Sequence, residues 1–184
     1  MARRTIVRVH PGSQAPVRPA TAYRPTNRRV LILPGLLLGI GLGGFVDGIV
    51  LHQLLQWHHM LSSEGSYPAT TVAGLEVNTL WDGLFHASTW LAVAVGLCFL
   101  WKAAGRGDVA WSGQAFIGLL AAGWGVFNLG EGVVDHHLLT IHHVRDDVAN
   151  KLPWDLGFLA FGALLVVVGW WLYRTAAPAS GRGS

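Results

Sequence analysis

Cysteine is nearly absent from the sequence, since Cys98 is the only one among 184 residues. A disulfide within the chain is therefore excluded, and so is a metal cage built from several thiolates of one chain. Charged residues are also scarce at 12%, while hydrophobic residues make up 52%. Soluble domains carry about 25% charged residues, and the mean hydropathy here is +0.42. We therefore predict an integral membrane protein.

Four apolar stretches are long enough to cross a hydrocarbon core, which takes about 20 residues of helix. They cover residues 30–55, 80–101, 113–139 and 154–173. We expect an all-α fold, a four-helix transmembrane bundle, with little chain left for another domain. Gly35, Gly39 and Gly43, at four-residue spacing in the first span, predict close packing of helix backbones. Residues 1–29 contain seven Arg and no acidic residue, which predicts a disordered basic tail, and residues 174–184 form a second tail.

Lys and Arg are distributed unevenly between the two ends of the predicted spans. Eleven of the thirteen fall in residues 1–29, in the loop 102–106 or after residue 173, and the other two are Arg145 and Lys151. Because positive residues are retained on the cytoplasmic side of a membrane, both termini are predicted to be cytoplasmic. The basic pI then follows from topology, so nucleic-acid binding is not needed to explain it.

The sequence contains an internal repeat at a constant offset of 84 positions. Residues 44–60, GFVDGIVLHQLLQWHHM, correspond to residues 128–144, NLGEGVVDHHLLTIHHV. A weaker match, at an offset of 73, aligns Trp81-Asp82 with Trp154-Asp155 at the starts of the second and fourth spans. We predict two parallel copies of a two-helix unit, related by a pseudo-two-fold axis along the membrane normal.

Acidic and histidine side chains gather near the outer ends of all four spans. An ionisable group inside a bilayer is costly unless it faces a partner or water, and no Lys or Arg occurs in the outer half-spans. Imidazole and carboxylate are together good ligands for divalent transition metals. We therefore predict a metal site at the outer ends of the helices, used for metal handling or redox chemistry, with copper, zinc or iron as the candidate ion.

Helix spacing divides the candidate ligands into two layers. Asp82 and His86 lie at i and i+4 and are predicted to chelate one ion, whereas His52 and His59 are about 10 Å apart along a continuous helix. Those two histidines could share an ion only if the helix were broken between them. The candidates are, in a lower layer, Asp47, His52, Asp82, His86, Glu131, Asp135 and His136, with Asp155 beside them, and in an upper layer His58, His59, His142 and His143.

Other functions stay open from the sequence. His52 and His136 could be the axial ligands of a haem, although the nearby carboxylates argue against an apolar haem pocket. A small ion or proton-coupled transporter, or a structural scaffold with a buried polar network, would also place titratable residues in the membrane. The Glu-x-x-His pattern of ferritin-like di-iron bundles is absent. No substrate pocket can be read from the sequence, so whether the protein is an enzyme is left open.

The stretches DGIVLHQLLQWHHM and EGVVDHHLLTIHHV, with WDGLFH between them, resemble the bacterial four-span membrane proteins catalogued as domain of unknown function 2243. The resemblance covers about residues 30–173. It implies a multi-pass protein of the bacterial plasma (inner) membrane, in contact with the lipid bilayer, and it supplies no activity and no assigned ligands. A setting near copper or respiratory-oxidase assembly genes is also implied, which favours copper slightly. A homo-oligomer or a respiratory or metal-handling membrane partner is compatible with it.

Overall fold

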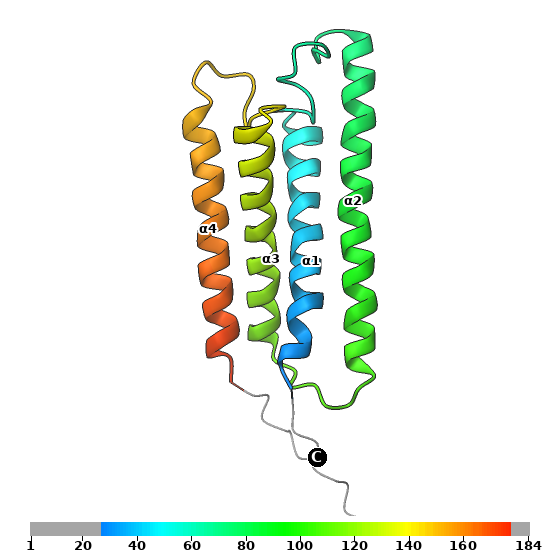
Figure 1. Cartoon of the computed structure of the whole chain (residues 1–184), viewed down its shortest axis with the longest axis vertical. Coiled ribbons are helices and arrows are strands. Elements are labelled where there is room, and N and C mark those ends of the chain that lie inside the picture. Colours follow the sequence, from blue (N-terminus) through cyan, green and yellow to red (C-terminus); the bar gives the residue numbers. More distant parts are fainter. Residues whose placement is uncertain (1–26, 178–184) are drawn as a thin grey trace, which may run out of the picture.

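Four long helices make up the protein, which a computed structural model describes for residues 27–177 (Figure 1). Residues 1–26 and 178–184, where the two tails were predicted, lie outside the described residues. No β-strand occurs in residues 27–177. The elements in chain order are η1 (Arg29–Leu31), α1 (Ile32–Val46), η2 (Asp47–Leu54), α2 (Val72–Ala104), α3 (Gly113–Val133), η3 (Val134–Leu138) and α4 (Leu152–Thr175).

All four helices are long and apolar enough to span a membrane. The candidate spans are Arg29–Leu54, Val72–Ala104, Gly113–Leu138 and Leu152–Thr175. Helix α2 begins at Val72, ahead of the stretch 80–101 predicted to cross the membrane, because the Thr71 hydroxyl caps it by accepting a hydrogen bond from the Gly74 N–H at 3.1 Å. With 33 residues, α2 is about 50 Å long. It therefore extends beyond a hydrocarbon core of about 30 Å.

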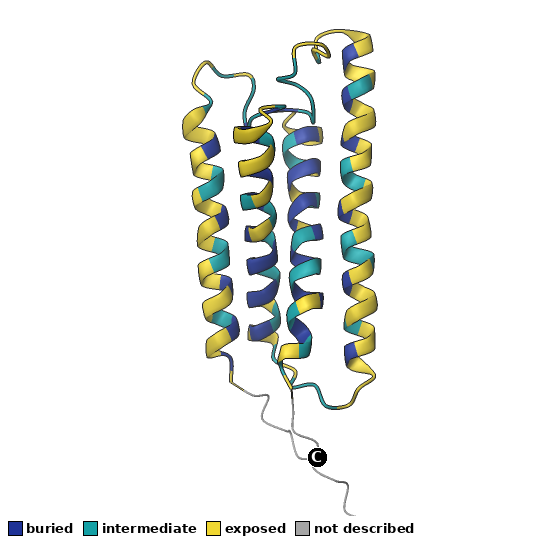
Figure 2. Cartoon of the chain, viewed as in Figure 1, coloured by how far each residue is buried: buried dark blue, intermediate teal, exposed yellow. Residues whose placement is uncertain are grey.

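The helices lie side by side in a row, in the order α4, α3, α1, α2 (Figure 1). Backbone packing links α1 to both α2 and α3, and α3 to α4. In the bundle expected from the sequence each helix would contact two neighbours, whereas here α2 and α4 each pack chiefly on one. Figure 2 shows that burial is concentrated on the central helices, while most of α2 and α4 is exposed. The exposed apolar faces of these outer helices suit contact with lipid.

Glycines allow the backbones of α1 and α3 to touch. A Cβ atom added at Gly39 would lie 2.8 Å from the Cα of Gly123 and against the carbonyl oxygen of Leu120. Gly35 and Gly43 also face α3, so the predicted glycine stripe lies at the central interface. Small residues at four-residue spacing permit this approach because no side chain separates the two backbones. The interface holds the ends of α1 and α3 together, and both helices continue into polar segments there.

Substitution of Gly39 by Ala is expected to destabilise the protein by about 1–3 kcal/mol, the usual cost of overpacking a tight contact. The matched control is Gly83→Ala on α2, because a Cβ atom there would meet nothing within 4 Å. The measurement is the midpoint of thermal unfolding of both variants in one detergent. Equal midpoints for Gly39→Ala and Gly83→Ala would contradict the importance of the α1–α3 contact.

Candidate metal centre

The chain reverses direction directly after η2. The N–H of Leu55 donates to the carbonyl of Val50 at 2.8 Å, which is the five-residue bond of a π-helix. Gln56 then has a φ of 50°, in the left-handed conformation that commonly ends a helix. The turn carries His58 back into the protein, where its ring centroid lies 4.4 Å from that of His52. The two rings, which the sequence assigned to separate layers, therefore lie at one level.

α3 ends in the same way, 84 positions later. The N–H of Leu139 donates to the carbonyl of Val134 at 2.8 Å, and Thr140 has a φ of 50°. A β-branched residue with positive φ is unusual, and such strain is typical of functional segments. The ring of His142 follows the turn and lies 4.9 Å from that of His136, centroid to centroid. Both central helices thus fold a second histidine back beside the first.

Four imidazoles and two carboxylates meet as a result in one buried cluster. Asp47, His52, His58 and Glu131 offer ligand atoms that all lie within 4.8 Å of one another, and Glu131, His136 and His142 do the same. Glu131 belongs to both sets. The rings of His58 and His142 stack face to face, 4.6 Å apart. We call these six residues the central cluster: Asp47, His52, His58, Glu131, His136 and His142.

The central cluster is rich in polar atoms that have no hydrogen-bond partner. These atoms are the Nε2 of all four histidines, the Nδ1 of His136, and both carboxylate oxygens of Asp47 and of Glu131. Asp47 Oδ2 lies 3.1 Å from His52 Nε2, and Glu131 Oε1 lies 3.5 Å from His142 Nε2, at ion-pair distance but without the geometry of a hydrogen bond. In residues 27–177, the ion pairs of these two carboxylates involve only histidines. Buried polar groups are rarely left unpaired, so the cluster could bind a cation.

The other ring nitrogens of three cluster histidines are held by the surrounding chain. A histidine whose Nδ1–H donates to an oxygen presents an unprotonated Nε2, which is the form that binds a metal. These contacts therefore select the tautomer that aims Nε2 into the central cluster. They join His52 Nδ1 to Asp82 Oδ1 (2.9 Å), His58 Nδ1 to the Val144 carbonyl (2.9 Å) and His142 Nδ1 to the Met60 carbonyl (3.2 Å).

Asp82 holds a cluster histidine in position and does not join the central cluster itself. One oxygen pairs with His52 and also accepts a hydrogen bond from the Met60 N–H at 3.0 Å. The other oxygen lies 2.6 Å from His59 Nδ1. The carboxylate is 2% exposed. Asp82 thus fixes both a cluster histidine and the segment that follows η2.

Asp155 makes the corresponding contacts from α4. Its carboxylate lies 2.7 Å from His143 Nδ1, accepts a hydrogen bond from the Val144 N–H at 3.0 Å, and lies 3.6 Å from His136 Nδ1. His143, like His59, is therefore tied to a carboxylate outside the central cluster. Of the four predicted upper-layer residues, the structure brings His58 and His142 into the central cluster. It leaves His59 and His143 beside the cluster.

Besides Asp82, His59 and His143, the structure leaves two more predicted ligands outside the central cluster, His86 and Asp135. The Nδ1 of His86 lies 2.7 Å from the backbone carbonyl of Asp82, whose carboxylate faces η2, so the two side chains do not converge as their spacing suggested. Asp135 is half-buried and is part of neither ligand set. His137, which follows a cluster residue, lies 2.7 Å from the Gly132 carbonyl through its Nδ1. Spacing along one helix could not foresee which neighbour each side chain would meet.

The match to a protein family includes all the residues of this site. Residues 34–176 match the family described as predicted membrane protein (DUF2243). The chain belongs to this family. The resemblance drawn from the sequence motifs is thereby confirmed, and every residue of the central cluster lies within the matched region of the DUF2243 chain. No curated protein and no solved structure matches the chain.

In this DUF2243 protein the two loops close over the central cluster. The Ser63 N–H donates to the Ile141 carbonyl, and the Asp146 N–H donates to the Trp57 carbonyl, each at 2.9 Å. The Asp146 carboxylate also accepts hydrogen bonds from Ser62, Ser63 and Lys151, which lower its pKa although burial opposes the shift. The loops are therefore bound to each other and shield the cluster on the side opposite the chain ends.

Burial keeps the two loop histidines of the cluster neutral. It lowers the pKa of His58 to about 4, and it lowers the pKa of His142 well below its ordinary value. Neighbouring histidines lower both values further. A metal binds only the deprotonated imidazole. At neutral pH these two side chains are therefore already in the form that a metal requires.

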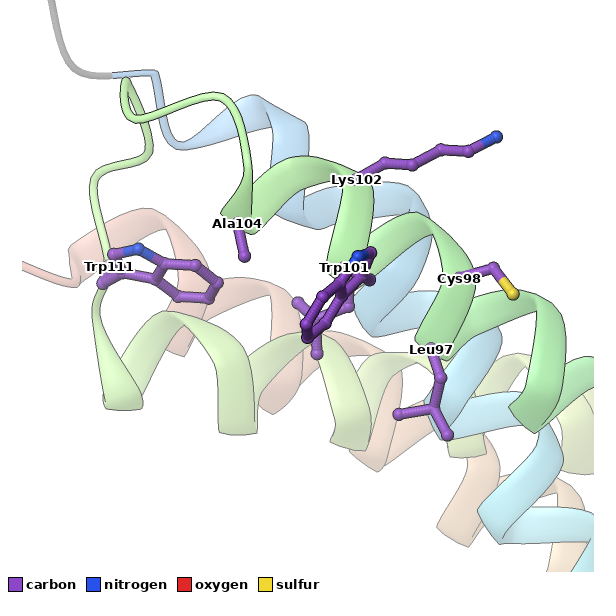
Figure 3. A pocket seen from close by; sticks show the side chains of 7 residues that line it. Leu97, Cys98, Trp101, Lys102, Ala104 and Trp111 are labelled. Atoms are coloured by element: carbon purple, nitrogen blue, oxygen red, sulfur yellow. The ribbon is translucent and has the colours of Figure 1, made fainter.

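A separate pocket of about 590 Å³ lies near the opposite end of α2 (Figure 3). Leu97, Cys98, Trp101 and Trp111 line it, and Lys102 lies at its edge. Cys98 is exposed there, so the single thiol contributes no ligand to the central cluster. The cluster donors are therefore imidazole nitrogen and carboxylate oxygen alone.

Proposed function

We propose that the protein binds two transition-metal ions in the central cluster, and that Glu131 would contribute to the binding of both. The observation that carries this proposal is the convergence of four Nε2 atoms and two carboxylates, all buried and none hydrogen-bonded. A purely structural polar network would pair these atoms with one another. Two divalent ions would instead satisfy both overlapping ligand sets, since Glu131 belongs to each.

The donor set favours iron among the candidate metals. His52, His58 and Asp47 would supply two imidazoles and a carboxylate to one ion. His136, His142 and Glu131 would supply the same donors to the other ion. Two histidines and one carboxylate with open positions are typical of non-haem Fe(II) sites, whereas Cu(I) prefers sulfur ligands. Zinc also accepts these donors. We propose a role in metal handling or redox chemistry at this centre.

Haem agrees less well with the cluster. A porphyrin ligated by His52 and His136 would have to lie between them, where the stacked rings of His58 and His142 and two carboxylates already converge. A transporter is also less well supported. The cluster residues lie at one end of the helices, and the described residues toward the other end of α1 and α3 are mainly glycine, alanine and leucine.

We further propose that the centre lies toward the outer side of a bacterial plasma membrane, at the interface of two repeated two-helix units. The uneven distribution of Lys and Arg supports cytoplasmic termini. The repeat is supported by matching contacts at offset 84: the π-helical bonds, the left-handed turns, and the loop carbonyls that hold His58 and His142. In membrane proteins built from repeats, binding sites commonly lie at the interface between the repeats.

Neighbouring histidines of η3 provide the direct test. The protein purified in detergent and reconstituted with Fe(II) is expected to retain about two ions per chain, as in known two-metal sites. His136→Ala should lose at least one of them because His136 is a cluster ligand. His137→Ala should retain both because its ring nitrogen is held by the Gly132 carbonyl outside the cluster. Elemental analysis measures this. Equal metal content in the two variants, or no metal in the wild type with Fe(II), Zn(II) or Cu, would overturn the proposal.

A further inference from the structure

A small apolar pocket adjoins the central cluster between α1, α3 and α4. Its volume is about 170 Å³, and Val50, Trp124 and Phe158 are among its lining residues. Only two of the lining side chains are polar, Asp47 and Asn128. Since Asp47 is a cluster residue, the pocket borders the proposed metal site.

Asn128 is a second, independent sign that the pocket receives a ligand. The residue is 2% exposed, and its side-chain amide makes no hydrogen bond in the described chain, so that its NH2 group is left as a donor for a bound molecule. An unpaired amide inside an apolar helix interface is costly. Its side chain lines the pocket beside Asp47, so a molecule in the pocket would meet both the amide and the metal centre.

The pocket is present where the two halves of the chain differ. At offset 84, Asn128 corresponds to Gly44. A Cβ atom at Gly44 would lie 3.3 Å from the ring of Phe127 and against the methyl group of Thr89. That side is therefore filled by neighbouring helices, and the corresponding pocket cannot form there. The central cluster therefore has a pocket on the Asn128 side and none at the corresponding position on the Gly44 side. Packing of the helices alone does not require this difference.

The pocket faces the bilayer and not water. Val46 and Phe161, which line it, are 41% and 45% exposed on the apolar helix surface. On the water side, a pocket of about 460 Å³ reaches His58, but the loops tied by Ser63 and Asp146 leave His58 only 2% exposed and His142 fully buried. A molecule that uses this route must therefore be uncharged and soluble in lipid.

The size of the pocket restricts the ligand further. A cavity of about 150 Å³ binds xenon or benzene, while sites for drug-sized ligands take about 300–1,000 Å³. The pocket is therefore too small to enclose a whole lipid or quinone. We infer that a small apolar gas of the dioxygen class reaches the metal ions from the bilayer through this pocket and is held by a hydrogen bond from the Asn128 amide. This inference rests on the proposed metal centre and concerns binding alone.

The route is tested by the rate at which nitric oxide binds the Fe(II)-loaded protein. The rate is measured in lipid nanodiscs without oxygen. Val50→Phe should fill the pocket and slow the combination rate by about tenfold, within the range over which association rates vary among related variants. Phe161→Ala should widen the opening and raise the rate. Asn128→Leu should increase the dissociation rate by about tenfold, the effect of one lost hydrogen bond. Stopped-flow absorption of the iron–nitrosyl complex measures these rates.

Ile49→Phe is the matched control, because Ile49 is 46% exposed on the same turn of η2 and does not line the pocket. It should combine with nitric oxide at the wild-type rate. Metal content is measured for each variant. If Val50→Phe loses iron, Phe161→Ala and Asn128→Leu decide the question. Full iron content with rates equal to wild type in those variants would overturn the route through the bilayer, whereas a wild type that holds no metal would overturn the proposed function.

Discussion

Glu131→Gln is expected to abolish stable binding of both metal ions and yet to make the metal-free protein more stable. Glu131 is the one residue shared by both ligand sets. A neutral amide is a poorer ligand for a divalent ion than a carboxylate, and even substitutions outside the ligand shell cost 10–100-fold in affinity. We therefore expect a loss of more than about 100-fold in affinity for each ion.

The stabilising part of the prediction comes from charge. In the metal-free protein the carboxylates of Glu131 and Asp47 lie within 4.8 Å of each other, and both are buried. Two like charges at that distance disfavour each other's ionisation. The nearest histidine, His142, is neutral because burial lowers its pKa, so Glu131→Gln breaks no ion pair of full charges. The substitution removes either this repulsion or the free-energy cost of protonating one carboxylate to avoid it, and little attraction is lost.

Metal content checks the expected loss of binding, and thermal unfolding of the metal-free form checks the expected gain in stability. Both are measured on the same preparation. Asp135→Asn is the control, since Asp135 lies one turn further along and is part of neither ligand set. It should change the metal content little. A Glu131→Gln variant that keeps its metal and unfolds at lower temperature would instead identify Glu131 as a member of a structural network.

The residues of the central cluster could be found from the sequence, but their grouping could not. Composition identified a membrane protein, and the motifs around His52 and His136 identified the family. The separation of His52 from His59 was calculated for a continuous helix, whereas the helix ends at the left-handed turn of Gln56. Glutamine and threonine are not the usual residues of such turns. These two turns are fixed only by the packing of the loops, through contacts between segments that are distant in the sequence.

The direction of each side chain was a second property that could not be predicted from the sequence. The i, i+4 spacing of Asp82 and His86 placed both on one face of α2, and their common use as ligands was a reasonable expectation. Asp82 instead meets η2 and its loop, while His86 bonds within its own helix. Asn128 was not singled out at all. The signal available for it was the absence of a counterpart in the other repeat, where Gly44 stands.

Asp82→Asn is expected to weaken metal binding by about 10–100-fold although Asp82 is not a ligand, as is usual for groups that orient metal-binding histidines. The carboxylate accepts from His52 at one oxygen and from His59 at the other. An asparagine offers one acceptor and one NH₂ donor. One histidine must then change tautomer or turn away, and if His52 does so, its Nε2 carries a proton and no longer binds.

The same substitution is expected to affect both halves of the centre. Asp82 also accepts from the Met60 N–H, and the Met60 carbonyl holds His142. Asp155 acts reciprocally, because it accepts from the Val144 N–H while the Val144 carbonyl holds His58. Residues in one hydrogen-bond network rarely contribute additively. The loss in Asp82→Asn/Asp155→Asn should therefore differ from the product of the single losses.

Competition with a chelator of known affinity measures these losses, with Glu76→Gln as the control because Glu76 is an exposed carboxylate on the same helix. That variant should bind metal as the wild type does. If Asp82→Asn does so too, within about twofold, the histidine tautomers are set by other contacts. Strictly additive losses in the double variant would mean that each aspartate serves only its own half. A larger or smaller combined loss is expected, because each loop carries a carbonyl that holds a cluster histidine of the other loop.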